Sequence, residues 1–190
     1  MDVHSTVRAS AISGLRHFPC DSVADFVVNA ARRDSSLLVL SSCLRVLSVI
    51  DSSRGFDMAA RNVGVDSYRN LIRHAALEAM VSLKDVRAIP FAMQYSEIAN
   101  PIDIRRLSVQ LLAEVGRNSK EARMRMMNLL NDWNNTIRKA TAEGLSTWEY
   151  PDVKAALNQR KLVEKDEIVV KAIEDAIATQ TGRLRGPVGK

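Results

Sequence analysis

Apolar residues recur every three or four positions along most of the chain, which is the spacing of one face of an α-helix. Six nine-residue segments share this pattern and align with one another without a gap. Each begins with a β-branched apolar residue and ends with Leu, Met or Ile. Their starts lie 32 or 33 residues apart, at Val7, Val39, Ile72, Ile104, Ile137 and Val169. This period is typical of a solenoid built from stacked helix pairs.

A further helix is predicted between each two consecutive segments, at residues 22–33, 55–63, 86–98, 120–130 and 150–163. The connections are only a few residues long, and eight Gly and five Pro are few for a chain of many β-turns. We therefore predict an all-α, right-handed solenoid of five to six helix pairs, about eleven helices in total. It would occupy residues 1–180, followed by a flexible tail over 181–190.

The predicted turns repeat as well. An Asp lies three to six residues before the first apolar residue of five segments, as Asp2, Asp34, Asp66, Asp132 and Asp166, and Asn100-Pro101 takes this place in the fourth. Asp and Asn cap helix N-termini by accepting a backbone N–H, so we expect these residues to be caps. The second position of four segments is Arg, as Arg8, Arg73, Arg105 and Arg138.

A turn Asp followed by Val/Ile-Arg-x-x-Ala-x-x-x-Leu resembles the second helix of a HEAT repeat. In that family the turn Asp and the helix Arg of neighbouring repeats pair in a ladder along the stack. The resemblance implies a structural role for the row of arginines. The alternative is a positive stripe that receives a carboxylate or phosphate, and both roles can coexist because Arg has five donors.

The residues proposed to bind a peptide or partner are therefore Arg73, Arg105, Arg106 and Arg138. Asn100 stands where Asp132 precedes Arg138. Arg105, with Arg106 beside it, is thus expected to be the least neutralised member of the row.

Residues 67–116 resemble the C-terminal HEAT-type region of zinc aminopeptidases of the aminopeptidase N type. The resemblance is carried by Ile72-Arg73, the run from Asp85 to Pro90, Asn100-Pro101 and Arg105-Arg106. It implies a non-catalytic scaffold domain that packs on a catalytic domain and limits peptide access to its active site.

The chain has no HExxH zinc motif and no GAMEN-like motif, so we expect no catalytic residue, metal ligand or cofactor in it. Zinc would belong only to a parent aminopeptidase. The array also starts with the second helix of a pair, which suggests a domain cut from a larger polypeptide. Val7, Ala11, Ile12 and Leu15 would then lean on something missing or be partly exposed.

His74 and Glu78 lie four residues apart and would share a helix face, as metal ligands or an acid–base pair do. The equivalent positions hold Ser41 and Arg45, Arg106 and Gln110, and Lys139 and Glu143. Because the repeats tolerate such different residues there, we interpret the pair as part of a variable polar surface.

Composition adds few constraints. Hydrophobic residues make up 46% and aromatic residues 5%, so the core is aliphatic, and we assign Met124, Met126 and Met127 to it. Cys20 and Cys43 are expected to be buried free thiols. The N-terminus has no signal-peptide pattern and no run is long enough for a membrane span, so a cytoplasmic protein without a membrane partner is expected.

Two other functions are considered. A free-standing HEAT adaptor for a protein partner would need polar end caps. A nucleic-acid protein, such as a HEAT-type alkylpurine DNA glycosylase, would need a basic concave face with exposed aromatics. The net charge of +5 permits this function without requiring it. We rank it last, because Trp133 and Trp148 flank turns, where we expect them to pack.

Overall fold

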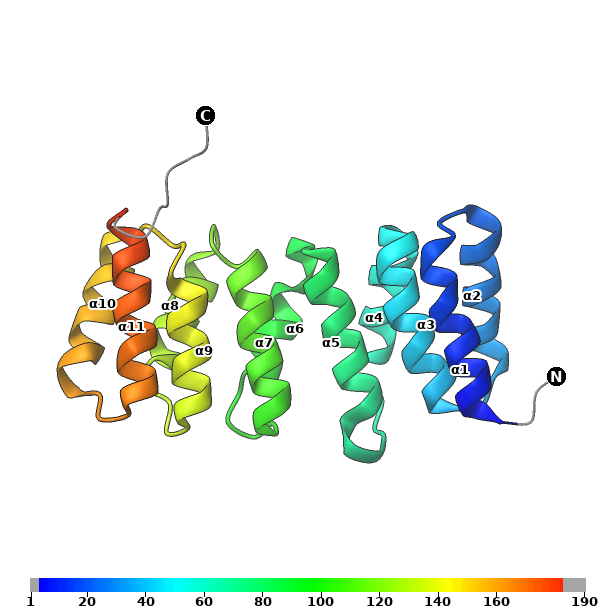
Figure 1. The fold of residues 1–190 in the computed structure, drawn as a ribbon, viewed down its shortest axis with the longest axis horizontal. Coiled ribbons are helices and arrows are strands. Elements are labelled where there is room, and N and C mark those ends of the chain that lie inside the picture. Colours follow the sequence, from blue (N-terminus) through cyan, green and yellow to red (C-terminus); the bar gives the residue numbers. More distant parts are fainter. Residues whose placement is uncertain (1–3, 183–190) are drawn as a thin grey trace. The chain divides into compact units, whose positions relative to one another are not determined.

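The computed structural model describes residues 4–182, which contain eleven α-helices, three short 3-10 helices and no strand (Figure 1). Asp2 and most of the predicted tail lie outside this range. The elements are α1 Ser5–Gly14, η1 Leu15–His17, α2 Asp21–Arg33, α3 Leu37–Ile50, α4 Ser52–Asn62, η2 Tyr68–Asn70, α5 Leu71–Leu83, η3 Val86–Ala88, α6 Ile89–Tyr95, α7 Ile102–Val115, α8 Lys120–Leu129, α9 Asn135–Leu145, α10 Pro151–Val163 and α11 Glu167–Gln180.

The predicted fold class, an all-α solenoid of helix pairs, is confirmed. The helices that carry the six aligned segments begin one or two residues before the predicted starts. The chain divides into two compact units, Met1–Ala88 and Ile89–Lys190, which are described separately below as unit 1 and unit 2.

Unit 1 is built around α3, which packs against α1, α2, α4 and α5. Helix α3 is apolar on almost every side, and its Leu44 and Leu47 are fully buried. A Cβ at Gly55 of α4 would lie 2.8 Å from the carbonyl oxygen of Leu47, so only glycine permits this close approach of α4 to α3. The centre of α5 is equally buried, with Leu77 and Met80 at 0% exposure.

Unit 2 contains two layers of helices. In one layer α7 packs against α9, and α9 packs against α11; in the other, α6, α8 and α10 each pack on the following helix of their pair. Trp148 is fully buried, and its indole N–H donates to the carbonyl oxygen of Ala113 at 3.3 Å. Trp148 therefore packs as predicted, whereas Trp133 is 65% exposed.

Several expected buried residues and caps differ from the prediction. Met126 is buried but Met124 is 52% exposed, and Cys43 is buried whereas Cys20 is exposed in the turn before α2. Burial raises the pKa of the Cys43 thiol to about 12.

Of the predicted capping residues, Asp166 caps its helix by accepting the N–H groups of Ile168 and Val169. Asp34 and Asp132 instead accept the amide two residues later, still within the turn. Asn100 donates its side-chain amide to the carbonyl oxygens of Gln94 and Glu97 and caps no helix. The turn acids of α3 and α9 are thus turn-forming residues rather than helix caps.

Candidate interaction surfaces

The regular spacing of the helix arginines places two of them inside unit 2. Arg105 is 1% exposed, donates its Nε to the carbonyl oxygen of Ser96 at 3.2 Å, and forms an ion pair with Asp132. Asp132 belongs to the turn before the following segment helix, α9. The guanidinium of Arg105 therefore ties its own preceding turn to the next one.

Arg138 repeats this arrangement. Its guanidinium donates to both carboxylate oxygens of Glu164, at 2.7 and 2.8 Å, and to the carbonyl oxygens of Asp132 and Trp133. Arg160 also donates to Glu164. Hydrogen bonds from Arg138, followed by those from turn amides and from Arg160, hold the pKa of the buried Glu164 carboxyl far below its usual value.

In unit 1, Arg8 forms an ion pair of the same kind with the acid of the next turn. Arg8 donates to both oxygens of Asp34, at 2.6 and 2.9 Å, and Asp34 also accepts the backbone N–H of Ser36. The hydrogen bond from the Arg8 guanidinium is the main cause that lowers the pKa of Asp34 to about 2.

Arg73 is half-buried and pairs within its own repeat. It donates to Asp66 at 3.2 Å, to the side chain of Asn70 at 2.5 Å and to the carbonyl oxygen of Val63 at 3.2 Å. In the preceding segment Leu40 stands at the position of the arginine, so that segment has no guanidinium there to pair forward with Asp66.

These contacts agree with a ladder between neighbouring repeats, since the arginines of α1, α7 and α9 each pair forward with the acid of the next turn. Arg105 was expected to be the least neutralised member of the row because Asn100 precedes it; that prediction is wrong, since Asp132 supplies its carboxylate and the side chain is almost completely buried.

His74 and Glu78 do share the exposed side of α5. The His74 Nδ1 lies 3.5 Å from the Glu78 carboxylate, which also accepts the Arg45 Nε at 2.7 Å. The side chains of His74 and Glu78 are about one-third exposed, at 32% and 38%. Over residues 4–182 no group of three His, Cys, Asp or Glu side chains is placed to hold a metal ion.

The fourth predicted binding residue, Arg106, has a different environment. It is exposed and forms no ion pair with any residue in the described part of the chain. Lys139 and Lys171 occupy the same position in α9 and α11; Lys171 is exposed, and Lys139 is half-buried. We call Arg106, Lys139 and Lys171 the cation row.

The cation row lies on α7, α9 and α11, three neighbouring helices of one layer, which run beside one another in Figure 1. The axes of packed helices lie about 8–10 Å apart, so the cation row is spread across the face in steps of about one helix width. Lys139 pairs with Glu143 one turn later at 2.8 Å. Lys171, like Arg106, makes no ion pair within residues 4–182, which leaves two of the three charges available to a partner.

Large apolar side chains are exposed at the edge where these three helices begin. Ile102 is 40%, Trp133 65% and Ile168 63% exposed. The forward ion pairs and the hydrogen bond from Asn135 to Asp166 at 2.7 Å hold the turns at this edge next to one another. The cation row is visible in the sequence, because its members stand at the third position of three segments, one residue after the position of the buried arginines. Only the arginine row was identified from the sequence as a regular feature.

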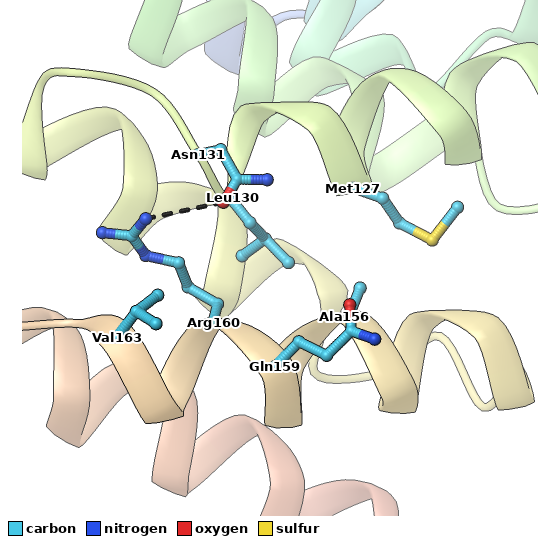
Figure 2. A pocket seen from close by; sticks show the side chains of 7 residues that line it. All are labelled: Met127, Leu130, Asn131, Ala156, Gln159, Arg160 and Val163. Carbon is cyan, nitrogen blue, oxygen red and sulfur yellow. Dashed lines mark hydrogen bonds between the residues drawn. The ribbon is translucent and has the colours of Figure 1, made fainter.

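The other layer of unit 2 has a shallow hollow between α8 and α10, of about 190 Å³ (Figure 2). Met127, Leu130 and Val163 contribute apolar atoms to it. Arg160 points its guanidinium toward the Asn131 side chain, at 3.5 Å, and is already bound to Glu164. This hollow brings no reactive side chains together.

Comparisons with known proteins identify the fold and no family. No protein-family model and no curated protein matches the chain. Among solved structures, the CpcE–CpcF complex of phycocyanin lyase from Nostoc sp. PCC7120 matches with a TM-score of 0.57 and 13% identity, over 90% of this chain and 99% of that one. YibA of Escherichia coli matches with a TM-score of 0.64 and 16% identity, over 95% and 70%.

Human deoxyhypusine hydroxylase in complex with glycerol matches over 93% of this chain and 91% of its own, with 16% identity but a TM-score of only 0.39. The CpcE–CpcF and YibA structures are HEAT-like, all-helical repeat folds, in agreement with the repeat pattern of the sequence. None of the three is an aminopeptidase. Within the described residues, no helix combines the length and apolar character that a membrane crossing requires.

Proposed function

We propose that this chain is a HEAT-like scaffold domain that binds a protein partner and performs no chemistry of its own. The observation that carries the proposal is the cation row, which places Arg106, Lys139 and Lys171 in register on three adjacent helices. The arginines of the buried row stabilise the turns of unit 2, whereas the cation row contributes to no described contact between helices. A regular, exposed set of charges of one sign favours a partner of the opposite sign.

The partner segment that this face fits is acidic and partly apolar. Arg106 offers a planar fork for a carboxylate, and Trp133 at the nearby edge offers a large aromatic surface. Exposed ion pairs contribute only about 0.2–1 kcal/mol each, so the apolar contacts would supply much of the affinity and the cations its selectivity. The structure of CpcE with CpcF is described as a complex, which agrees with protein-partner binding by such a fold.

A narrower form of the proposal makes the chain the C-terminal domain of an aminopeptidase N-type zinc enzyme. Its support is the sequence resemblance over residues 67–116. Part of that motif is a local turn, in which Asp85 accepts the backbone N–H of Arg87 and pairs with its guanidinium at 2.7 Å. An HExxH motif encoded upstream in the same reading frame would support this parent, and a complete reading frame without one would rule it out.

Peptide selection tests the proposed function. We expect a random display library to yield peptides rich in Asp and Glu, because the cation row is the most regular exposed charge of unit 2. The variant Arg106→Glu/Lys171→Glu should bind a selected peptide with an affinity lower by roughly tenfold or more, which corresponds to about 1.4 kcal/mol of binding free energy. Lys154→Glu, on the exposed side of α10, is the matched control and should leave the affinity unchanged. Selection of peptides without acidic residues, or equal binding by all variants, would contradict the proposal.

A further inference from the structure

Unit 1 has an apolar groove between α1 and α2 with a volume of about 380 Å³. Ile12 and Val39 form its buried floor. Ala11 and Phe26 are exposed at its sides, the latter at 58%. The polar residues that line it, Arg8 and Asp34, neutralise each other in an ion pair at 2.6 Å.

The repeat shows what is missing from this groove. In α3, α5, α7 and α9 the positions equivalent to Ala11 are fully buried, as Cys43, Ala76, Ser108 and Thr141. The positions equivalent to Leu15 are buried in the same four helices, as Leu47, Met80, Leu112 and Leu145. Each of these helices is covered by the first helix of its own pair. Within residues 4–182, α1 has no such covering helix, and its Leu15 is only half-buried.

Helix α11 differs from the other segment helices in having a charged residue at one otherwise apolar position. In α11 the position equivalent to Ile12 and Leu77 is Glu174, which is exposed and pairs with Lys161 of α10 at 2.9 Å. A polar residue at this position is what a terminal repeat needs in order to meet water. The groove beside α1 has apolar residues instead, so its composition is that of an internal repeat and suits a covering helix.

The charges beside the groove indicate the kind of helix that covers it. Arg16 follows Leu15, and Arg33 lies three residues after Ala30, on the same side of α2. Both are exposed and form no ion pair within the described range. The exposed acids of α2, Asp21 and Asp25, are bound by Arg54 of α4. The available charge around the groove is therefore positive.

We infer that the groove between α1 and α2 is a second interaction site, which takes an amphipathic helix of another protein with acidic residues flanking its apolar face. That helix would occupy the place of the first helix in an internal repeat, with apolar residues at i, i+4 and i+7. A second copy of the chain fits less well. If two grooves met, Arg16 and Arg33 would face the same residues of the other copy. If α11 of the second copy entered the groove, Glu174 would place a charge on apolar residues. This site goes beyond the proposed function and lies apart from the cation row in sequence and chemistry.

A pair of synthetic peptides tests the inference. Each is a stapled helix of about 14 residues, a typical helix length, with Leu and Ala on one face. One carries Glu on both flanks and the other carries Lys. By fluorescence anisotropy, the Glu peptide should bind the whole chain roughly tenfold or more tightly than the Lys peptide.

Two groove variants and two control variants assign the binding to the groove. Ala11→Glu and Phe26→Ala change exposed side chains, so both proteins should fold, with unchanged circular dichroism. Each should lower the affinity for the Glu peptide by roughly tenfold. Val49→Ala, an exposed apolar residue of α3 at 61%, is the control and should bind normally. Arg106→Glu should also bind normally, which separates this site from the cation row.

Other outcomes overturn the inference. If neither peptide binds, or if Ala11→Glu binds as well as the unmodified chain, the groove is not a helix site. If sedimentation shows a dimer that Ala11→Glu dissociates, a second copy occupies the groove. If the amides of α1 exchange with solvent as slowly as those of α3 in the dilute chain without peptide, a segment of the same chain already covers it.

Discussion

Arg105 and Arg106 are adjacent in α7 but lie in opposite environments, because each residue of a helix is rotated by about 100° from the one before it. Arg105 points between the helices and pairs with Asp132, whereas Arg106 points into solvent. The guanidinium that repeats most regularly in the sequence is thus a structural group. The available charge belongs to its neighbour.

Arg105→Ala should lower the free energy of unfolding by about 3–5 kcal/mol, because it leaves the carboxylate of Asp132 buried without its partner. Arg106→Ala, the matched control, should change it by less than about 0.5 kcal/mol. Urea denaturation followed by circular dichroism measures both. Similar losses for the two variants would mean that the burial of Arg105 is wrongly assigned.

Acid should destabilise the protein through Asp34 and Glu164. Their carboxyl pKa values are lowered in the folded state, that of Asp34 from 3.8 to about 2, so the unfolded chain binds protons first. The free energy of unfolding should therefore be constant from about pH 7 to about pH 5 and fall from about pH 4 towards about pH 2. Glu164→Gln should show a shallower fall than the unmodified chain. An equally steep fall in this variant would exclude Glu164 as a source of the acid sensitivity.

At the scale of helices, the periodic apolar pattern predicted the existence and order of all six segment helices, because it reflects the local geometry of a helix. The forward pairing of Arg105 and Arg138 could not be predicted in the same way, since it depends on where the following turn lies. Cys20 shows the same limit: it looked apolar in sequence, but it lies in the turn between η1 and α2, where nothing covers it.

Leu77→Ala should cost about 2–5 kcal/mol, the usual range for a large cavity in a packed core. Leu77 is fully buried at the centre of α5, and the equivalent residues Leu44 and Val109 are buried as well. Urea denaturation again measures the change. A loss below about 1 kcal/mol would show that this face of α5 is not the core face.

At the scale of the whole molecule, the pI of about 9.5 raises the alternative of nucleic-acid binding. The arginines of the buried row, Arg105 and Arg138, are neutralised by carboxylates, which leaves the cation row as the regular basic feature of unit 2. If duplex DNA binds there, three phosphate contacts give a plot of log K against log salt with a slope no steeper than about −3. A markedly steeper slope, measured by fluorescence anisotropy over a salt series, would favour a nucleic-acid function.

The central claim is that the face of α7, α9 and α11 binds an acidic protein segment through the cation row. A charge exchange tests it most directly. A peptide selected on the unmodified chain would be compared with a version in which its acidic residues are replaced by Lys, on both the unmodified chain and Arg106→Glu/Lys171→Glu. Our account predicts that the acidic peptide prefers the unmodified chain and the Lys peptide prefers the variant, each by roughly tenfold. The same preference order for both peptides on both proteins would contradict it.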